Sequence, residues 1–434
     1  MQFLDIVLKK RNEKSLSKEE IEFLVREYVA GKIPDYQMSA FLMAVYFNSL
    51  NRQETAYLTK SMADSGDRLD LSQIDGFKVD KHSSGGVGDS VSLVLVPLVR
   101  AVGLKIGKLS GRGLGHTGGT IDKLESIPGF NVDLTTDEFL DGVDRIGMAI
   151  MEHTSNLVPA DQKLYELRDV TGTVKSLPLI ISSIMSKKIA CGPDGIVLDI
   201  KTGSGAIVDE FKEAEELAGG CVDIGREVGL NVSALITDMN QPLGRSVGNA
   251  LEVKEAIKVL KGQKEGELRE VTVALVAELL LQSGKAETLK VAKETVESKL
   301  TSGEALSKFE QLVENQGGNP EVANNTEILP ASDKKARIKA DQIGFVGDLD
   351  ALKIGRAANI LGAGRSEKGQ EIDPGVGIQL KRKVGDEVTE EDHLAVIHYN
   401  DGKHLNKAKQ MVQEAYDVRG TPPPEVQLIK ERVR

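Results

Sequence analysis

Residues 77–120 read FKVDKHSSGGVGDSVSLVLVPLVRAVGLKIGKLSGRGLGHTGGT. The segment 77–80 is typical of a strand, and the apolar segment 91–102 predicts a buried helix. A second strand is predicted at 105–109. Each strand is followed directly by a glycine-rich run, at 81–90 and 110–120. This order of strand, loop and helix predicts an α/β fold with helices packed on a sheet.

The same alternation returns further along the chain. We predict strands at 195–200 and 231–238, and helices at 209–228 and from about residue 248. Strands separated by helices form a mostly parallel or mixed sheet. We therefore expect a large α/β domain from residues 67–156 and 191–330, with the polar stretch 314–325 acting as a linker.

The N-terminal segment is helical instead. Ser17 and Glu20 have capping-box spacing, and apolar residues from Ile21 to Val29 recur at helical intervals. Further helices are predicted at about 35–46, at 51–66 and within 156–190. We expect a small all-α domain from residues 1–66 and 157–190. Such short helices leave apolar faces uncovered, which suggests a partner subunit.

The C-terminal part has a different pattern. Residues 373–380 and 383–388 predict short strands joined by glycine turns, and residues 408–416 predict a helix. We expect an α+β, barrel-like subdomain over 331–434. Its strands look like those of a lipoyl carrier, but the central lysine turn of such carriers is missing.

Composition restricts the function. The 434 residues include 55 Lys and Arg against 66 Asp and Glu, a net charge of −11. An acidic chain argues against a general nucleic-acid binder or a membrane-surface protein. Asp5 interrupts any signal-peptide core, and no apolar run is long enough to cross a bilayer. We expect a cytoplasmic protein in which Cys191 and Cys221 are buried and unbridged.

The glycines are concentrated near the opening segment. Ten of the 44 lie in residues 80–120, and residues 78–123 carry seven Lys or Arg against three Asp. Glycine lets backbone N–H groups approach a ligand closely. Hydroxyls and cations are added by Ser83, Ser92, Ser110, Thr120, Lys81 and Lys108. The two runs together predict a phosphate site, although glycine turns that bind nothing remain the alternative. Neither run has P-loop or dinucleotide-binding spacing.

Two further groups of residues are candidates for chemistry. His82 lies within the first run, and its ordinary pKa range suits proton donation to a leaving group. We expect His116 to shape the second run. Ser183 and Lys187 are four residues apart on a predicted helix, and Arg168 precedes them. Together they suit a flat, oxygen-rich ligand, but spacing alone favours a solvated helix face.

Four segments together resemble the thymidine/pyrimidine nucleoside phosphorylase family. They are residues 81–89, 110–123, 168–173 and 201–206, and the likeness extends over essentially the whole chain. The resemblance implies a cleft between an α domain and an α/β domain, and a homodimer formed through the α domains. The implied reaction is reversible phosphorolysis of uridine, deoxyuridine or thymidine. Inorganic phosphate is the co-substrate, and no organic cofactor is needed.

The resemblance also assigns roles to individual residues. It implies catalysis by His82, Arg168 and Lys187, with protonated His82 close to the base, and base recognition by Arg168, Ser183 and Lys187. A monovalent cation, K⁺, is expected from the bacterial members. The implied phosphate ligands are Lys81, His82, Ser83, Ser92, Lys108, Leu109, Ser110 and Thr120, and the implied cation ligands are Gly88, Ser90, Leu243, Ser246 and Glu255.

Some positions depart from the family pattern. Ser84 and Ser90 replace the usual threonines but keep the hydroxyl group. Ile207 and Val208 stand where a Phe-Met pair is common, which leaves sugar and base preference open. The alternatives are a strict thymidine phosphorylase or an anthranilate-type phosphoribosyltransferase. The latter would need acidic Mg²⁺-binding motifs, and the sequence has no clear candidate.

Overall fold

The centre of the molecule is a six-stranded sheet with the order β13-β5-β4-β1-β2-β3. It is seen in a computed structural model that describes residues 1–113, 115–154, 156–263, 265–365 and 370–434. Five strands are parallel, and β13 is antiparallel to β5. The strands are β1 (Lys78–Ser83), β2 (Lys105–Ser110), β3 (Met148–Glu152), β4 (Gly195–Thr202), β5 (Asn231–Asp238) and β13 (Ile429–Val433). The α/β class and the four predicted strands are confirmed.

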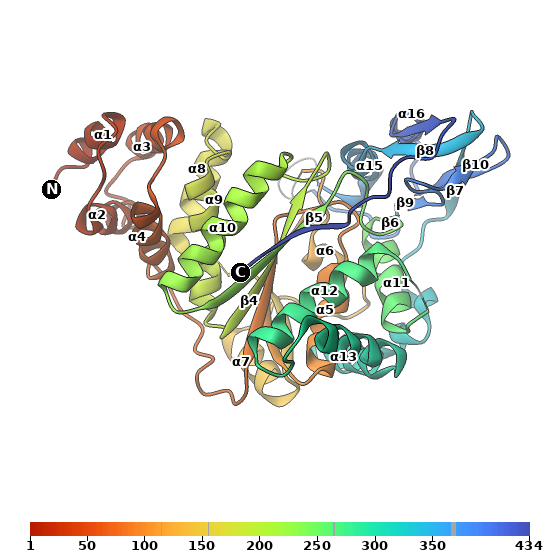
Figure 1. The fold of residues 1–434 in the computed structure, drawn as a ribbon, viewed down its shortest axis with the longest axis horizontal. Helices are drawn as coiled ribbons and strands as arrows, with labels where there is room; N and C mark the ends of the chain where they lie inside the picture. The colour runs from red at the N-terminus through yellow and green to blue at the C-terminus, as the bar shows by residue number, and fades with distance from the viewer. Residues whose placement is uncertain (114, 155, 264, 366–369) are drawn as a thin grey trace.

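Helices cover both faces of this sheet (Figure 1). Successive side chains of a strand point to opposite faces. Val197 of β4 therefore packs with α5 (Val91–Ala101) and α12 (Glu267–Gln282), whereas Ile196 and Leu198 pack with α9 (Leu177–Cys191) and α10 (Phe211–Glu227). The other helices of this part are α6 (Thr120–Leu124), α7 (Thr136–Arg145), α11 (Asn249–Leu260), α13 (Leu289–Thr301) and α14 (Glu304–Asn315). Cys191 and Cys221 are buried and unbridged, as expected.

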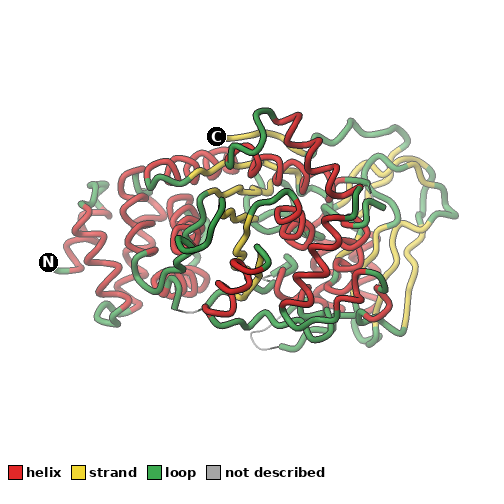
Figure 2. Tube along the Cα trace, turned by 90° about the horizontal axis from the view of Figure 1, so that it is seen from below, coloured by secondary structure: helices red, strands yellow, loops and turns green. Residues whose placement is uncertain are grey.

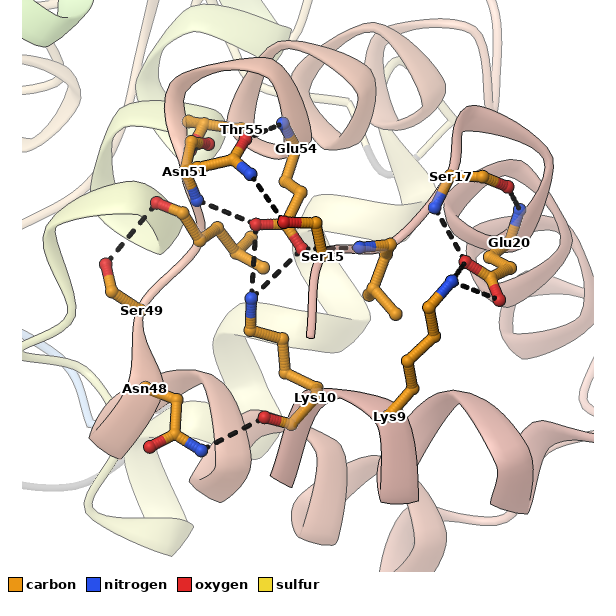
Figure 3. A network of polar contacts seen from close by, with 12 residues as sticks. Lys9, Lys10, Ser15, Ser17, Glu20, Asn48, Ser49, Asn51, Glu54 and Thr55 are labelled. Atoms are coloured by element: carbon orange, nitrogen blue, oxygen red, sulfur yellow. Dashed lines mark hydrogen bonds and ion pairs between the residues drawn. The ribbon is translucent and has the colours of Figure 1, made fainter. Parts of the chain in front are cut away.

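The N-terminal helices form a second core with α8 (Pro159–Thr171) and α9. They are α1 (Phe3–Arg11), α2 (Lys18–Val29), α3 (Asp35–Asn48) and α4 (Arg52–Ala63). The predicted capping box of Ser17 and Glu20 is present. Figure 3 shows the polar contacts of the buried Glu54. Its carboxylate accepts hydrogen bonds from Lys10 Nζ at 3.0 Å and from Leu16 N at 2.8 Å. This ion pair holds α1 against α4.

Helix α3 exposes several large apolar side chains. Tyr36 is 74% exposed and Phe47 76%, and Met43 and Tyr46 are also exposed. Single exposed apolar residues are ordinary, but four on one helix form a surface that a partner can cover. The expected partner subunit stays a prediction.

The C-terminal part contains two small sheets at the end of the molecule opposite the N-terminal helices (Figure 2). One has the order β6-β9-β11-β7, and the other β10-β8-β12. Their strands are β6 (Ser246–Val247), β7 (Lys334–Lys339), β8 (Gly344–Leu349), β9 (Gly377–Leu380), β10 (Glu387–Val388), β11 (His393–Tyr399) and β12 (Tyr416–Arg419). The helices of this part are α15 (Ala351–Ala358), η3 (Asn359–Ala363) and α16 (Leu405–Gln413).

Two local predictions are wrong. The helix predicted at 408–416 ends earlier, because Tyr416 begins β12 and its hydroxyl donates to Leu394 O at 2.9 Å. The stretch 314–325 is not a free linker. Gln316 donates from its amide to Ile150 O at 2.7 Å, and Val322 in η1 (Pro320–Ala323) is fully buried. A further turn, η2 (Thr326–Ile328), follows. Among the described residues, no helix combines the length and apolarity that a membrane span requires.

Candidate functional site

The first glycine run begins inside the central sheet. Strand β1 continues past the predicted end at Asp80, so Lys81, His82 and Ser83 lie at its carboxyl end. Ligands of open α/β sheets bind at this edge. Lys81 is buried, with Nζ 3.7 Å from Asp199 Oδ2. Burial lowers the pKa of Lys81, while Asp89 and Asp199 oppose that shift. Ser83 Oγ donates to Asp89 Oδ2 at 2.8 Å.

The neighbouring strand β2 supplies a second cation and a hydroxyl. Lys108 is buried, and its Nζ donates to Leu109 O at 2.8 Å. Its nearest carboxylate contact is Asp80 Oδ1 at 4.0 Å. Burial, and next the charge of Lys188, lower the pKa of Lys108 to about 7. Ser110 Oγ is buried with no hydrogen-bond partner among the described residues. A buried polar atom without a partner favours a ligand that completes its hydrogen bonds.

Helix α5 brings Ser92 to the same edge of the sheet. Ser92 lies in the first turn of this helix, directly after the first glycine run, and is buried. Thr120, the last residue of the second run, begins α6. The free N–H groups at the start of α5 favour an anion. The proposed phosphate ligands thus lie at the carboxyl ends of two adjacent parallel strands and in the first turns of the helices α5 and α6.

The other predicted cluster lies on α9. Lys187 Nζ donates to Ser183 Oγ at 3.0 Å, which confirms that the two share a helix face. Ser183 is only 6% exposed, so the solvated-face alternative is wrong for this residue. Arg168, on α8, is also buried, but its guanidinium donates to Thr173 O, Val174 O and Leu179 O. Three of its five N–H groups are therefore used, and two remain for a ligand.

Two residues of this region were missed from the sequence. Asp161 is an ion-pair partner of Lys187, and its buried Oδ1 has no hydrogen-bond partner among the described residues. His153 follows β3 and lines a cavity of about 370 Å³ together with Asp161, Tyr165 and Lys187. Asp161 precedes Arg168 by seven residues, a helical interval that places both on one face of α8. This seven-residue spacing is the sequence signal that could have identified Asp161.

The two clusters face a common electropositive region. Burial and the charges of Lys188, Lys187 and Lys108 hold the pKa of His153 well below its usual range. Burial and the same three lysines, with Lys81, do so for His82. Lysines from α9 and β2 thus act on both imidazoles, and Lys81 of β1 acts on His82 as well. In the free protein, burial and the neighbouring positive charges disfavour the imidazolium form of His82, and its protonation during the reaction stays a prediction.

The end of β4 and the segment after it border the first glycine run. Lys201 Nζ lies 2.7 Å from Asp199 Oδ2, and Lys201 N donates to Ser84 Oγ at 2.8 Å. The serine at position 84 therefore keeps a structural hydroxyl. A Cβ on Gly85 would lie 3.4 Å from Ile207 Cδ1. An aliphatic side chain, rather than an aromatic one, covers this part of the loop.

The residues expected to bind K⁺ lie close together. A Cβ on Gly244 would lie 2.9 Å from Glu255 Oε2 and 3.1 Å from Gly88 O, and a Cβ on Gly88 would lie 3.0 Å from Ser246 O. Leu243 is held nearby, since its N–H donates to Val87 O at 3.0 Å. Carbonyl oxygens with one carboxylate are hard ligands, which suit K⁺. Two of the expected ligand groups already have partners, since Leu243 O accepts from Lys383 Nζ at 3.0 Å and Ser90 Oγ donates to Glu252 Oε2 at 2.8 Å. Among the described residues, no group of three His, Cys, Asp or Glu side chains is placed to hold a metal ion.

Comparison with known proteins agrees with this geometry. Models of the glycosyl transferase family match its helical bundle domain at residues 4–66 and its a/b domain at residues 75–306. The model of the pyrimidine nucleoside phosphorylase C-terminal domain matches residues 345–419. A relative from Geobacillus stearothermophilus, named pyrimidine-nucleoside phosphorylase, is 48% identical over 433 residues and all of both chains. The chain belongs to the pyrimidine-nucleoside phosphorylase family.

Other members of the pyrimidine-nucleoside phosphorylase family are equally similar. The Staphylococcus haemolyticus protein is 52% identical over 92% of each chain, and the Bacillus subtilis protein 49% over 96% of this chain and 95% of its own. The family resemblance inferred from the motifs is confirmed, and the protein is an enzyme of the glycosyltransferase class.

A solved anthranilate phosphoribosyltransferase from Thermus thermophilus shares the fold. Its TM-score is 0.60 at 17% identity, and the match covers 71% of this chain and 98% of that one. At this identity the likeness shows the fold alone.

Proposed function

We propose that this protein catalyses the reversible phosphorolysis of pyrimidine nucleosides to a free base and ribose or deoxyribose 1-phosphate. One observation carries the proposal. The phosphate cluster and the base cluster both reach Asp80, whose carboxylate lies 2.7 Å from Nζ of Lys188, next to Lys187 on α9, and 4.0 Å from Lys108 Nζ. Nucleoside and phosphate can therefore be held in adjacent positions, as a displacement at C1′ requires.

Phosphate is the nucleophile, so the protein has to supply positioning and charge. A phosphate oxygen forms a bond to C1′ while the bond from C1′ to N1 of the base breaks. The electron pair of that bond remains on the base, whose carbonyl oxygens become more negative. Lys187 and the two remaining N–H groups of Arg168 are suited to stabilise this charge. Ser183 is suited to bind the base edge.

The role of His82 depends on phosphate. The lysines around it keep the free imidazole neutral, but a bound dianion would offset their charge and favour the protonated form. In that state His82 is suited to share a proton with the departing base. His153 faces the same lysines and is a second candidate for a contact near the sugar or base.

Two further properties follow from the family pattern. We propose that K⁺ binds among Gly88, Ser90, Leu243, Ser246 and Glu255, where a cation would neutralise the carboxylate and fix the first glycine run against the segment before β6. We also propose a homodimer formed through the helical domain. Tyr36 and Phe47, which are both exposed on α3, support this helix as part of the dimer interface.

The deciding experiment measures base release. Purified protein is incubated with uridine, deoxyuridine or thymidine, with and without inorganic phosphate, in the absence of Mg²⁺. We expect phosphate-dependent release of uracil or thymine from all three nucleosides. Activity with thymidine alone would favour the strict thymidine phosphorylase. Failure to release base from any of them would refute the proposed function.

A further inference from the structure

A buried ion pair lies beside both glycine runs. Lys123, on α6, and Glu252, on α11, have Nζ and Oε2 2.7 Å apart, and both side chains are at least 98% buried. Neither residue is among the expected phosphate, base or cation ligands. Two charges buried this deeply lose their hydration, so such a pair contributes little to stability compared with apolar residues of similar size.

The pair contacts the first run at two adjacent residues. Lys123 Nζ donates to the backbone oxygen of Asp89 at 2.8 Å. Ser90 Oγ donates to Glu252 Oε2, also at 2.8 Å. Asp89 is the residue whose side chain accepts from Ser83 Oγ, and Ser90 directly precedes the start of α5, which carries Ser92. These contacts fix the end of the loop that joins Ser83 of β1 to the helix that carries Ser92.

The pair also packs against the second run. A Cβ on Gly118 would lie 3.1 Å from Lys123 Cε and 3.5 Å from Glu252 Oε1. Lys123 lies on the same short helix as Thr120, one turn later. The remaining carboxylate oxygen, Glu252 Oε1, accepts from Gly248 N at 3.2 Å, which holds the start of α11. One ion pair is thus in contact with both loops and with the helix behind them.

We propose that Lys123 and Glu252 are positioning residues that fix the two glycine runs relative to each other, so that Ser83, Ser92 and Thr120 converge on one phosphate ion. This role rests on the proposed phosphorolysis. Glycine-rich segments have many accessible conformations, and ordering them when phosphate binds costs affinity. An ion pair that orders both loops before phosphate binds removes that cost. Loss of the ion pair should therefore weaken phosphate binding more than nucleoside binding.

The experiment compares Lys123→Met, Glu252→Met and the double variant. Each single variant leaves one buried charge unpaired, so we expect a lower thermal midpoint. The double variant removes both charges, and we expect it to recover most of that loss. In all three we expect the KM for phosphate to rise at least tenfold, while the KM for uridine stays within twofold of the wild-type value. Glu252→Gln, which keeps the side-chain size, should raise the KM for phosphate at least threefold even where the methionine variants fold poorly.

A matched control comes from the helical domain. Lys10 and Glu54 form an ion pair of similar burial, 3.0 Å apart (Figure 3). They lie on α1 and α4, at the end of the molecule away from α5 and α6 (Figure 1). The single variants Lys10→Met and Glu54→Met should lower the thermal midpoint, and their double variant should recover most of that loss. All three should leave the KM for phosphate unchanged.

The outcomes separate the two proposals. A Lys123 and Glu252 double variant with recovered midpoint and a phosphate KM within twofold of wild type would overturn the positioning role. Parallel changes in kcat and in both KM values would overturn it as well, because they indicate a purely structural pair. Wild-type protein that releases no base in the same assay would refute the proposed function instead.

Discussion

Lys108 should make phosphate binding sensitive to pH just above neutrality. Its Nζ is buried at the carboxyl end of β2, beside Lys188 and Lys81, and is 4.0 Å from Asp80. Burial and the charges of the two lysines lower the pKa of Lys108 to about 7, although Asp80 opposes the shift. A lysine is cationic below its pKa, so the form that attracts phosphate is present at lower pH and is lost as the pH rises. Bound phosphate favours the cationic form, and binding should take up a proton.

The magnitude follows from this pKa. Between pH 7.5 and pH 9 the protonated fraction falls from about one quarter to about one hundredth. If only the protonated form binds, the KM for phosphate rises about 25-fold, equivalent to about 2 kcal/mol. His82 and His153 do not titrate in this window, because their pKa values lie well below 6.5. The pKa of Lys81 is also lowered, so a variant is needed to assign the effect.

The assay is steady-state uridine phosphorolysis at saturating uridine, with phosphate varied at each pH from 7.5 to 9. Lys108→Arg keeps its charge throughout this range and should remove most of the rise. Lys108→Met should show a high KM for phosphate at every pH. A flat wild-type profile would refute the reasoning, and so would the same slope in wild type and Lys108→Arg. Isothermal titration in buffers of different ionisation enthalpy checks the predicted proton uptake.

The other predictions concern the base cluster, the cation and the dimer. Arg168→Ala should lower kcat/KM by about 100-fold or more. It should also lower the thermal midpoint, because three backbone oxygens lose their donor. Near-normal turnover would contradict the role of Arg168. Asp161→Asn should raise the KM for uridine about tenfold by releasing Lys187, without changing the KM for phosphate. Replacing K⁺ with tetramethylammonium should lower activity or the thermal midpoint, and no change in either would argue against the cation site. Phe47→Glu should shift sedimentation from dimer to monomer, and an unchanged dimer would place the interface elsewhere.

Much of the phosphate side could be predicted because its signals are local. Strands β1 and β2 and the loops after them follow one another within 44 residues, so hydrophobic pattern and glycine content identify both. The parallel sheet then brings the loops together at one edge. Helical spacing predicts that Ser183 and Lys187 share a face, and the 3.0 Å hydrogen bond between them confirms it. Spacing alone favours a solvated face, so their assignment to the base comes from the family resemblance.

The remaining errors come from contacts between distant segments. Gln316 belongs to a polar stretch, but its amide pairs with Ile150, which is 166 residues away in sequence. The lowered pKa of His82 depends on burial and on four lysines. Lys81 is its sequence neighbour, but Lys108 comes from β2, and Lys187 and Lys188 come from α9. Asp161 and Glu252 acquire their roles in the same way, from partners 26 and 129 or more residues away.

The antiparallel strand β13 has a consequence for how the molecule assembles. It pairs with β5 although about 190 residues of chain separate them, and it covers the open edge of the central sheet. Until the ribosome has made residues 429–433, the backbone groups along that edge of β5 have no strand to pair with. Unpaired edges template association with other chains. Nascent protein should therefore be most vulnerable to aggregation after the phosphate loops are already formed, during synthesis of the C-terminal sheets.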